Sequence, residues 1–210
     1  MQNQTKIFFL LGLFVGMIIG MNFLGGKIVS LFGVSVSVGI FMVPITFLIT
    51  DIIAEVYGKK MAQQFVTTGL VILLIIFAFT SIFVIIEPHE RYAYNGEYET
   101  IFGASLRIMV ASIIAYIISQ YHDIWAFEFW KAKTKGRFLW LRNNFSTIVS
   151  QAIDTLIFMF IAFYHLTPKF DALFILELAI PYYLFKIAFA IMDTPFIYLG
   201  VRWLKTGKKR

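Results

Sequence analysis

Long stretches of this chain carry no charged residue, and this feature limits the fold more than any other. The runs 7–26, 28–50 and 61–86 contain no Asp, Glu, Lys or Arg. A bilayer's hydrocarbon core, about 30 Å thick, takes roughly 20 apolar residues as a helix, so each run is long enough to cross it. Overall, 60% of the residues are hydrophobic and 14% are charged, against about 25% charged in soluble domains. The sequence therefore predicts an all-α integral membrane protein and excludes a water-soluble one.

Two later apolar runs, 101–121 and 144–164, hold one charge each, Arg107 and Asp154. The last apolar stretch, 172–201, is too long for one upright span. We expect a spanning helix to begin at Pro181, because proline's missing N–H costs nothing in the first turn of a helix. The sequence thus predicts a six-helix bundle in a single membrane domain, residues 1–210. Its spans are 7–26, 36–57, 61–86, 101–121, 144–164 and 181–201, with an interfacial inner loop at 122–143. The aromatic and apolar residues from Ile124 to Trp130 in this loop precede several lysines and suit a helix lying in the interface.

The positions of Lys and Arg between the spans predict the orientation, since these residues accumulate on the cytoplasmic side. With both termini in the cytoplasm, only Lys27, Arg91 and Lys169 lie outside. Inside lie Lys6, Lys59, Lys60, Lys131, Lys133, Lys135, Arg137, Arg142, Arg202, Lys205, Lys208, Lys209 and Arg210. The net charge of +6 is therefore a topology signal, and we expect membrane lipid but no nucleic acid as a partner.

Charged side chains inside the spans are candidate binding residues, because each costs roughly 2.5–3.5 kcal/mol at the centre of a span. Asp51 and Glu55 are four residues apart and share a helix face. Such a pair can accept hydrogen bonds from a donor-rich ligand or hold one proton between them. The alternative is that both carboxylates pair with Lys59 and Lys60 at the interface.

Two cations also lie within spans. Arg107 cannot be neutralised, so it must face the bundle and meet an acidic or carbonyl partner. Lys186 can pair with Asp154 or Asp193, or contact a substrate. For both cations, a structural contact that needs no ligand is the alternative.

The spacing S-Q-x-x-D occurs twice, from Ser119 through Gln120 to Asp123 and from Ser150 through Gln151 to Asp154. Ser and Asp at positions i and i+4 give the same polar helix face each time. This is either a duplicated element or a coincidence of two short matches. Asp154, near the bilayer centre, is the stronger candidate for binding.

Polar and small residues at two other places also suggest contacts. Arg142 and Asn143 enter the fifth span, where Arg142 could meet a ligand or the paired acids. Gly12, Gly16 and Gly20 form a stripe that permits close backbone approach. Packing within the bundle is one explanation of the stripe, and a homodimer or another partner is the other.

The sequence carries no catalytic or metal motif. It has no H-E-x-x-H, no glycine-rich phosphate loop, no cysteine, and no Ser and His at a shared depth. We therefore expect no enzyme, no cofactor and no metal. Inward polar groups on several helices without a catalytic set indicate binding and passage, which is a transporter.

Two motifs resemble those of one family. They are T-D-x-x-x-E-V-Y-G, residues 50–58, and R-N-x-x-S-T-x-x-S-Q-x-x-D, residues 142–154. With Arg107, Ser119, Gln120, Asp123 and Lys186, they are similar to the queuosine-precursor transporter family, also labelled vitamin-uptake transporters. The resemblance implies a bacterial inner-membrane importer of 7-deazaguanine bases, such as 7-cyano-7-deazaguanine, used in tRNA modification. It also implies a bundle similar to the vitamin-binding subunits of energy-coupling-factor importers.

The polar residues suit such a nucleobase-like substrate. A carboxylate accepts hydrogen bonds from amino edges of bases, Gln or Asn can satisfy a carbonyl, and aromatic side chains stack on the ring. The predicted substrate-binding residues are Asp51, Glu55, Arg107, Gln120, Asp123, Arg142, Asn143, Gln151, Asp154 and Lys186.

Three functions stay open from the sequence. The first is a stand-alone secondary transporter. The second is a substrate-binding subunit that needs separate ATPase chains, with the glycine stripe as its docking face. The third is an intramembrane enzyme that uses Asp51 and Asp154 as an aspartyl pair.

Overall fold

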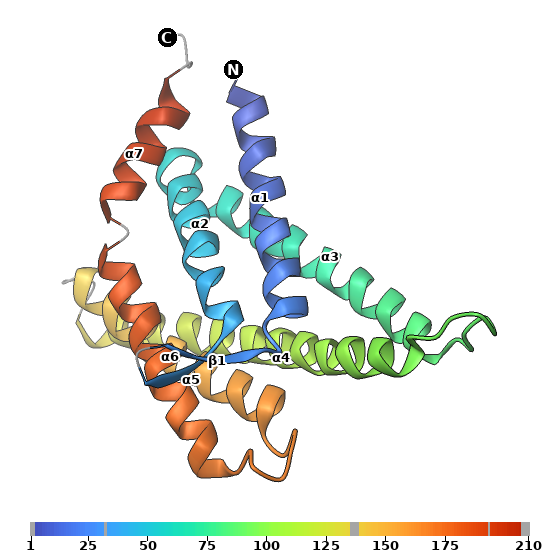
Figure 1. Ribbon diagram of the computed structural model, residues 1–210. Helices are drawn as coiled ribbons and strands as arrows, with labels where there is room; N and C mark the ends of the chain where they lie inside the picture. Colours follow the sequence, from blue (N-terminus) through green and yellow to red (C-terminus); the bar gives the residue numbers. More distant parts are fainter. Residues whose placement is uncertain (1–2, 32, 135–138, 193, 207–210) are drawn as a thin grey trace. The chain divides into compact units, whose positions relative to one another are not determined.

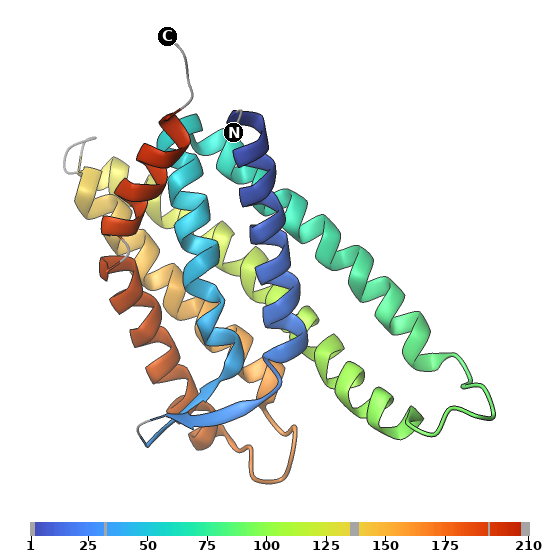
Figure 2. The ribbon, with the colours of Figure 1, turned by 45° about the horizontal axis from the view of Figure 1, so that its top comes forward.

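The computed structural model describes residues 3–31, 33–134, 139–192 and 194–206, and this part of the chain is mostly helical (Figure 1). Its elements are α1 (Asn3–Leu24), β1 (Ile28–Leu31), β2 (Val34–Ser37), the 3₁₀ helix η1 (Val38–Phe41), α2 (Val43–Tyr57), α3 (Lys59–Ile85), α4 (Asn95–Lys133), α5 (Leu139–Phe163), α6 (Ala172–Met192) and α7 (Thr194–Lys205). The two short strands form a two-stranded sheet between α1 and η1 (Figure 2).

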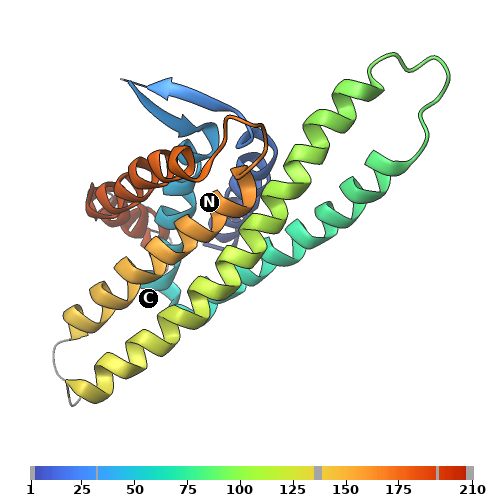
Figure 3. The same ribbon diagram turned by 90° about the horizontal axis from the view of Figure 1, so that it is seen from below.

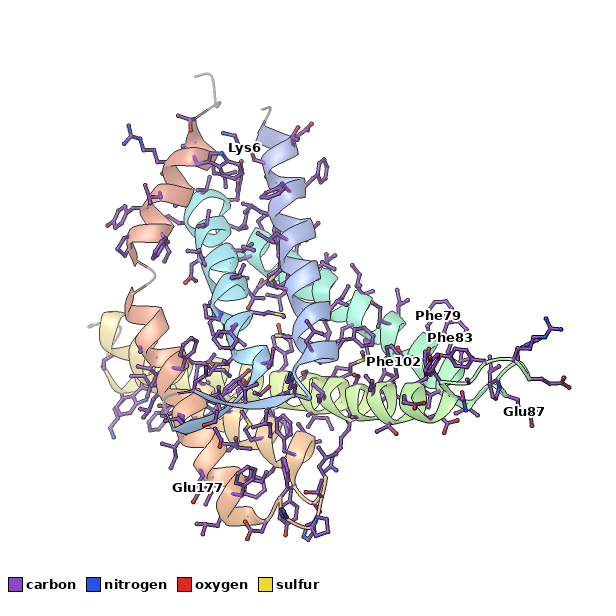
Figure 4. All side chains as sticks on the ribbon, viewed as in Figure 1. Lys6, Phe79, Phe83, Glu87, Phe102 and Glu177 are labelled. Carbon is purple, nitrogen blue, oxygen red and sulfur yellow. The ribbon has the colours of Figure 1, made fainter. Side chains whose placement is uncertain are left out.

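Four helical stretches of the described chain are long and apolar enough to cross a membrane. They are Gln4–Leu24, Val38–Tyr57, Lys60–Ile85 and Asn95–Ser119. The C-terminal half of α3 also exposes large apolar side chains, among them the stacked rings of Phe79 and Phe83 (Figure 4). Exposed apolar surface of this kind suits contact with lipid. The chain is thus a membrane-embedded helical protein, and the count of six spans stays a prediction.

The chain divides into two compact units. The first unit consists of Met1–Val29, Ser37–Leu106 and Ala188–Arg210. In it α1, α2 and α7 lie side by side, and α3 packs on α1 and α2 (Figures 1 and 2). The buried core of this packing is formed by Leu10, Phe14, Ile49, Ile52, Ile53, Phe65 and Leu204.

Two glycines allow the close packing of the first unit. Gly58, the single residue between α2 and α3, has φ 86° and ψ 168°, a conformation that is essentially restricted to glycine. At Gly200 on α7, a Cβ atom would overlap the side chain of Ile52 on α2. The backbone conformation of Gly58 therefore explains why the T-D-x-x-x-E-V-Y-G motif ends in glycine.

Lys6 ties the start of α1 to the end of α7 (Figure 4). Its Nζ donates to the backbone carbonyls of Trp203 and Thr206 and lies 5.1 Å from the centre of the Trp203 ring. Carbonyls in the last turn of a helix have no partner within the helix. Lys6 supplies that partner and is only 5% exposed.

The second unit consists of Ser30–Val36 and Arg107–Ile187. It contains the C-terminal part of α4, all of α5 and most of α6. Figure 3 shows α5 running alongside α4, and hydrogen bonds join the two helices. Asp171 begins α6 by accepting from the backbone N–H of Phe174, as an N-cap residue does.

The expected helix start at Pro181 is wrong, because Pro181 lies inside α6. An internal proline removes one backbone hydrogen bond, and helices in membranes tolerate this where neighbouring groups compensate. Helix α6 ends at Met192, and α7 begins at Thr194 with Pro195 in its first turn. Pro195 thus occupies the helix-start position that was predicted for Pro181.

Part of the segment 122–143, predicted as an inner loop with an interfacial helix from Ile124 to Trp130, is helical, because α4 continues without a break from the fourth predicted span to Lys133. With 39 residues, α4 is about 58 Å long at 1.5 Å per residue, which exceeds a bilayer core. Near its end the rings of Trp125 and Phe129 stack, and Lys133 lies over Phe129. This aromatic and basic end is typical of a membrane–water interface.

The glycine stripe of α1 does not pack uniformly. A Cβ atom at Gly12 or Gly16 would meet no described atom within 4 Å, whereas one at Gly20 would contact the side chain of Met42. Packing within the first unit therefore explains Gly20 alone among the three. A homodimer or partner contact at Gly12 and Gly16 stays a prediction.

Candidate functional site

A partly buried ion pair joins two helices of the second unit. Lys186 Nζ on α6 is 2.7 Å from Asp154 Oδ2 on α5, and the side chains are 7% and 23% exposed, respectively. Ser119 on α4 donates to the other oxygen, Asp154 Oδ1, at 3.3 Å. Three helices thus contribute one polar group each, and the lysine compensates the charge of the carboxylate.

The two copies of S-Q-x-x-D lie opposite each other on antiparallel helices. Ser119 of the first copy meets Asp154 of the second, and Ser150 of the second lies 3.0 Å from His122 Nδ1, within the first. Both serines are buried. The two copies therefore contribute two polar contacts between α4 and α5.

An aromatic pair lies one helical turn from the ion pair. The rings of Phe158 on α5 and Tyr182 on α6 stack with their centres 6.3 Å apart and an angle of 25°. Lys186 Nζ is 5.4 Å from the centre of the Tyr182 ring, within the range of a cation–π contact. A flat apolar surface thus adjoins the charged groups.

Two buried polar atoms beside Asp154 have no hydrogen-bond partner among the described residues. They are Gln151 Oε1 and Thr155 Oγ1. Thr155 is 1% exposed. Such groups are rare in native structures, and each calls for an explanation such as a bound water or a ligand.

Arg107 binds the end of α5. Its Nε donates to the carbonyl of Ile161 at 2.6 Å, and its Nη2 donates to the carbonyl of Tyr164. These carbonyls lie in and just beyond the last turn of the helix, where partners within the helix are missing. Of the partners expected for Arg107, carbonyls are the ones observed.

The other predicted site residues belong to the first unit or have side chains outside the described residues. Asp51 and Glu55 are exposed on α2, in the first unit. The side chains of Gln120, Asp123, Arg142 and Asn143, and the whole of residue 193, lie outside the described residues. Among the predicted ion pairs of Lys186, the one with Asp154 is observed.

Thr155, Phe158 and Tyr182 were not among the predicted site residues. Each lies four residues from a predicted one. Thr155 follows Gln151, Phe158 follows Asp154, and Tyr182 precedes Lys186. The helix period alone places them on the same faces.

The described surface also has hollows away from this cluster. One of about 860 Å³ lies over α7, lined by Pro195, Tyr198, Leu199, Val201, Arg202, Lys205 and Thr206. Another of about 560 Å³ lies over α3, lined by Lys60, Gln63, Gln64, Thr67, Thr68, Val71 and Ile72. Neither contains a predicted site residue. No group of three or more metal-binding side chains occurs in the described part of the chain.

Comparison with known proteins identifies relatives of the chain. Residues 37–200 match a family described as "Putative vitamin uptake transporter". The chain is 32% identical over 184 residues to the "Probable queuosine precursor transporter" of Bacillus subtilis (strain 168), a match that covers 87% of this chain and 79% of that protein. It is 31% identical over 199 residues to the "Queuosine precursor transporter" of Escherichia coli (strain K12), with 90% and 84% covered. No solved structure matches the chain.

Proposed function

Because the chain belongs to the queuosine precursor transporter family, we propose that it imports a queuosine precursor across a cell membrane. The family predicted from the motifs is confirmed. The relatives are named as transporters, so the prediction of a transporter rather than an enzyme is confirmed as well. Neither name refers to a subunit of an energy-coupling-factor importer, and that alternative is not favoured.

The substrate that we propose is 7-cyano-7-deazaguanine or a related 7-deazaguanine base, taken up for tRNA modification. The observation that carries the proposal is the cluster of Ser119, Asp154 and Lys186, in which three helices of a membrane protein bring one polar group each into contact. Polar groups at such depth are costly and mark substrate paths. The adjoining rings of Phe158 and Tyr182 suit a flat heterocycle.

We propose that the base binds in a polar cavity within the helix bundle and that ten residues contact or position it, Arg107 by holding the end of α5. Asp154, Lys186 and Gln151 form the central part of this set. The full set is Asp51, Glu55, Arg107, Gln120, Asp123, Arg142, Asn143, Gln151, Asp154 and Lys186.

The location that we propose is the bacterial inner membrane, with six spans, a single membrane domain and both termini in the cytoplasm. The distribution of Lys and Arg supports this orientation. The aromatic rings near the C-terminal end of α4 support the placement of that end at the membrane–water interface.

The test is uptake of labelled 7-cyano-7-deazaguanine by liposomes that contain the purified chain alone. Uptake is expected with the unmodified chain and not with Asp154→Asn, which should still insert into the membrane. Glu177→Gln is the matched control, because Glu177 is an exposed acid on α6 that points away from the helix (Figure 4). Wild-type uptake by Asp154→Asn would refute the site, and no uptake by the unmodified chain would refute a stand-alone importer.

A further inference from the structure

We propose that Thr155 is a further substrate-contacting residue, and that its hydroxyl and the side-chain carbonyl of Gln151 together recognise the lactam edge of the base. This inference rests on the proposed function and assigns the recognition of the substrate to named atoms. Both atoms are buried and lack a partner among the described residues.

The hydroxyl of Thr155 departs from the usual behaviour of threonine in a helix. A buried helical threonine generally donates to a backbone carbonyl three or four residues earlier. On α2, Thr46 donates to Val43 at 2.7 Å, and Thr50 donates to Phe47 at 2.8 Å. Thr155 makes no such bond in the described structure, although it is 1% exposed. Its hydroxyl is therefore available to a ligand.

Gln151 and Thr155 occupy one face of α5, one turn and about 6 Å apart along the helix axis. Asp154 is adjacent, but both of its oxygens already accept, one from Ser119 and one from Lys186. The acceptor left unused at this face is the amide oxygen of Gln151, and the donor left unused is the hydroxyl of Thr155.

A guanine-type lactam edge complements this pair. It presents a carbonyl acceptor beside an N–H donor, with the exocyclic amine as a second donor. The Thr155 hydroxyl would donate to the carbonyl, and Gln151 Oε1 would accept from the N–H side. The aromatic rings of Phe158 and Tyr182 lie one turn further along and would adjoin the ring plane. The bound base satisfies both unpartnered atoms at once.

This assignment makes the site selective for oxo bases. A site built to hydrogen-bond a polar group strongly rejects an analogue that lacks it, because its own buried groups are then left unpaired. The informative pair of ligands is 7-cyano-7-deazaguanine and 2-amino-7-cyano-7-deazapurine. The second compound lacks the carbonyl and, with it, the proton on N1.

The experiment measures binding of both ligands to the purified full chain in lipid nanodiscs. The unmodified chain should prefer the oxo base. Thr155→Val should weaken binding of the oxo base by about tenfold, as expected for one hydrogen bond, and should leave binding of the deoxo analogue unchanged. Thr155→Ser, which keeps the hydroxyl, should restore the preference. Thr46→Val is the matched control, because the buried hydroxyl of Thr46 is satisfied within its own helix.

A melting curve separates a ligand contact from a structural role. Removing an unpartnered buried hydroxyl should leave the melting temperature of Thr155→Val unchanged or raise it. A clear fall would show that the hydroxyl is paired within the protein and would overturn the assignment. Equal binding of the oxo base by Thr155→Val and the unmodified chain would overturn it too, with the proposed function intact. Absence of oxo-base binding by the unmodified chain would refute the proposed function and the inference together.

Discussion

Lys186, which is buried, and Asp154, which is partly buried, form an ion pair at 2.7 Å between α6 and α5. The pair is electrically neutral as a whole, which lowers the cost of placing two charges at this depth. Either residue alone would be an uncompensated charge. Removing one partner from a buried pair typically costs about 3–5 kcal/mol.

Lys186→Met should therefore destabilise the protein strongly, because it leaves Asp154 charged and without its cation. A fall of about 3 kcal/mol in the free energy of unfolding is expected. The double variant Lys186→Met with Asp154→Asn should recover most of this loss, since neither charge remains. Thermal melting in detergent of the two single variants and the double variant measures the coupling. Strictly additive effects would contradict a direct pair.

Much of this site was accessible from the sequence because it follows from charge and helix period. The long uncharged runs predicted helices. The cost of burying Arg107 predicted an acidic or carbonyl partner, and the partners observed are the carbonyls of Ile161 and Tyr164. The pairing of Lys186 with Asp154 was one of three alternatives. Selecting it required the packing of α5 on α6, which no local pattern encodes.

Other features could not be obtained from local patterns. Pro181 and Pro195 are chemically alike, so the sequence alone did not decide which one begins a helix. The sequence did not predict that α4 continues beyond residue 121, because the charged and aromatic residues that follow suit both a loop and a separate interfacial helix. Thr155 was missed for another reason, since the lack of a hydrogen-bond partner is a property of three-dimensional surroundings.

Gly58→Ala should destabilise the turn between α2 and α3. The backbone at Gly58 has φ 86° and ψ 168°, and a side chain in that region costs about 1–3 kcal/mol. Gly12→Ala is the matched control, because Gly12 lies in a helix with no described atom within 4 Å of a new Cβ. Melting curves should show a loss for Gly58→Ala and none for Gly12→Ala. Equal melting temperatures for Gly58→Ala and the unmodified chain would show that this turn has another conformation.

Lys6→Met should loosen the contact between α1 and α7. The methionine keeps most of the apolar stem but cannot donate to the carbonyls of Trp203 and Thr206. Because hydrogen bonds to charged groups contribute about 1.5–3 kcal/mol, a clear fall in the melting temperature is expected. Hydrogen exchange should report earlier opening at the end of α7. Exposed Lys205→Met serves as the control, and a similar fall in both variants would indicate a general charge effect.

A substitution at Arg107 can distinguish a structural role of this residue from a substrate-binding role. Its guanidinium donates through Nε and Nη2 to two carbonyls at the end of α5, a fork that a lysine cannot reproduce. Arg107→Lys keeps the charge, so it should lower the free energy of unfolding by about 1–3 kcal/mol while the folded fraction still takes up substrate. The exposed Arg202→Lys on α7 should change neither property. Uptake lost by Arg107→Lys at an unchanged melting temperature would instead place the guanidinium against the substrate, because a helix cap alone acts through stability.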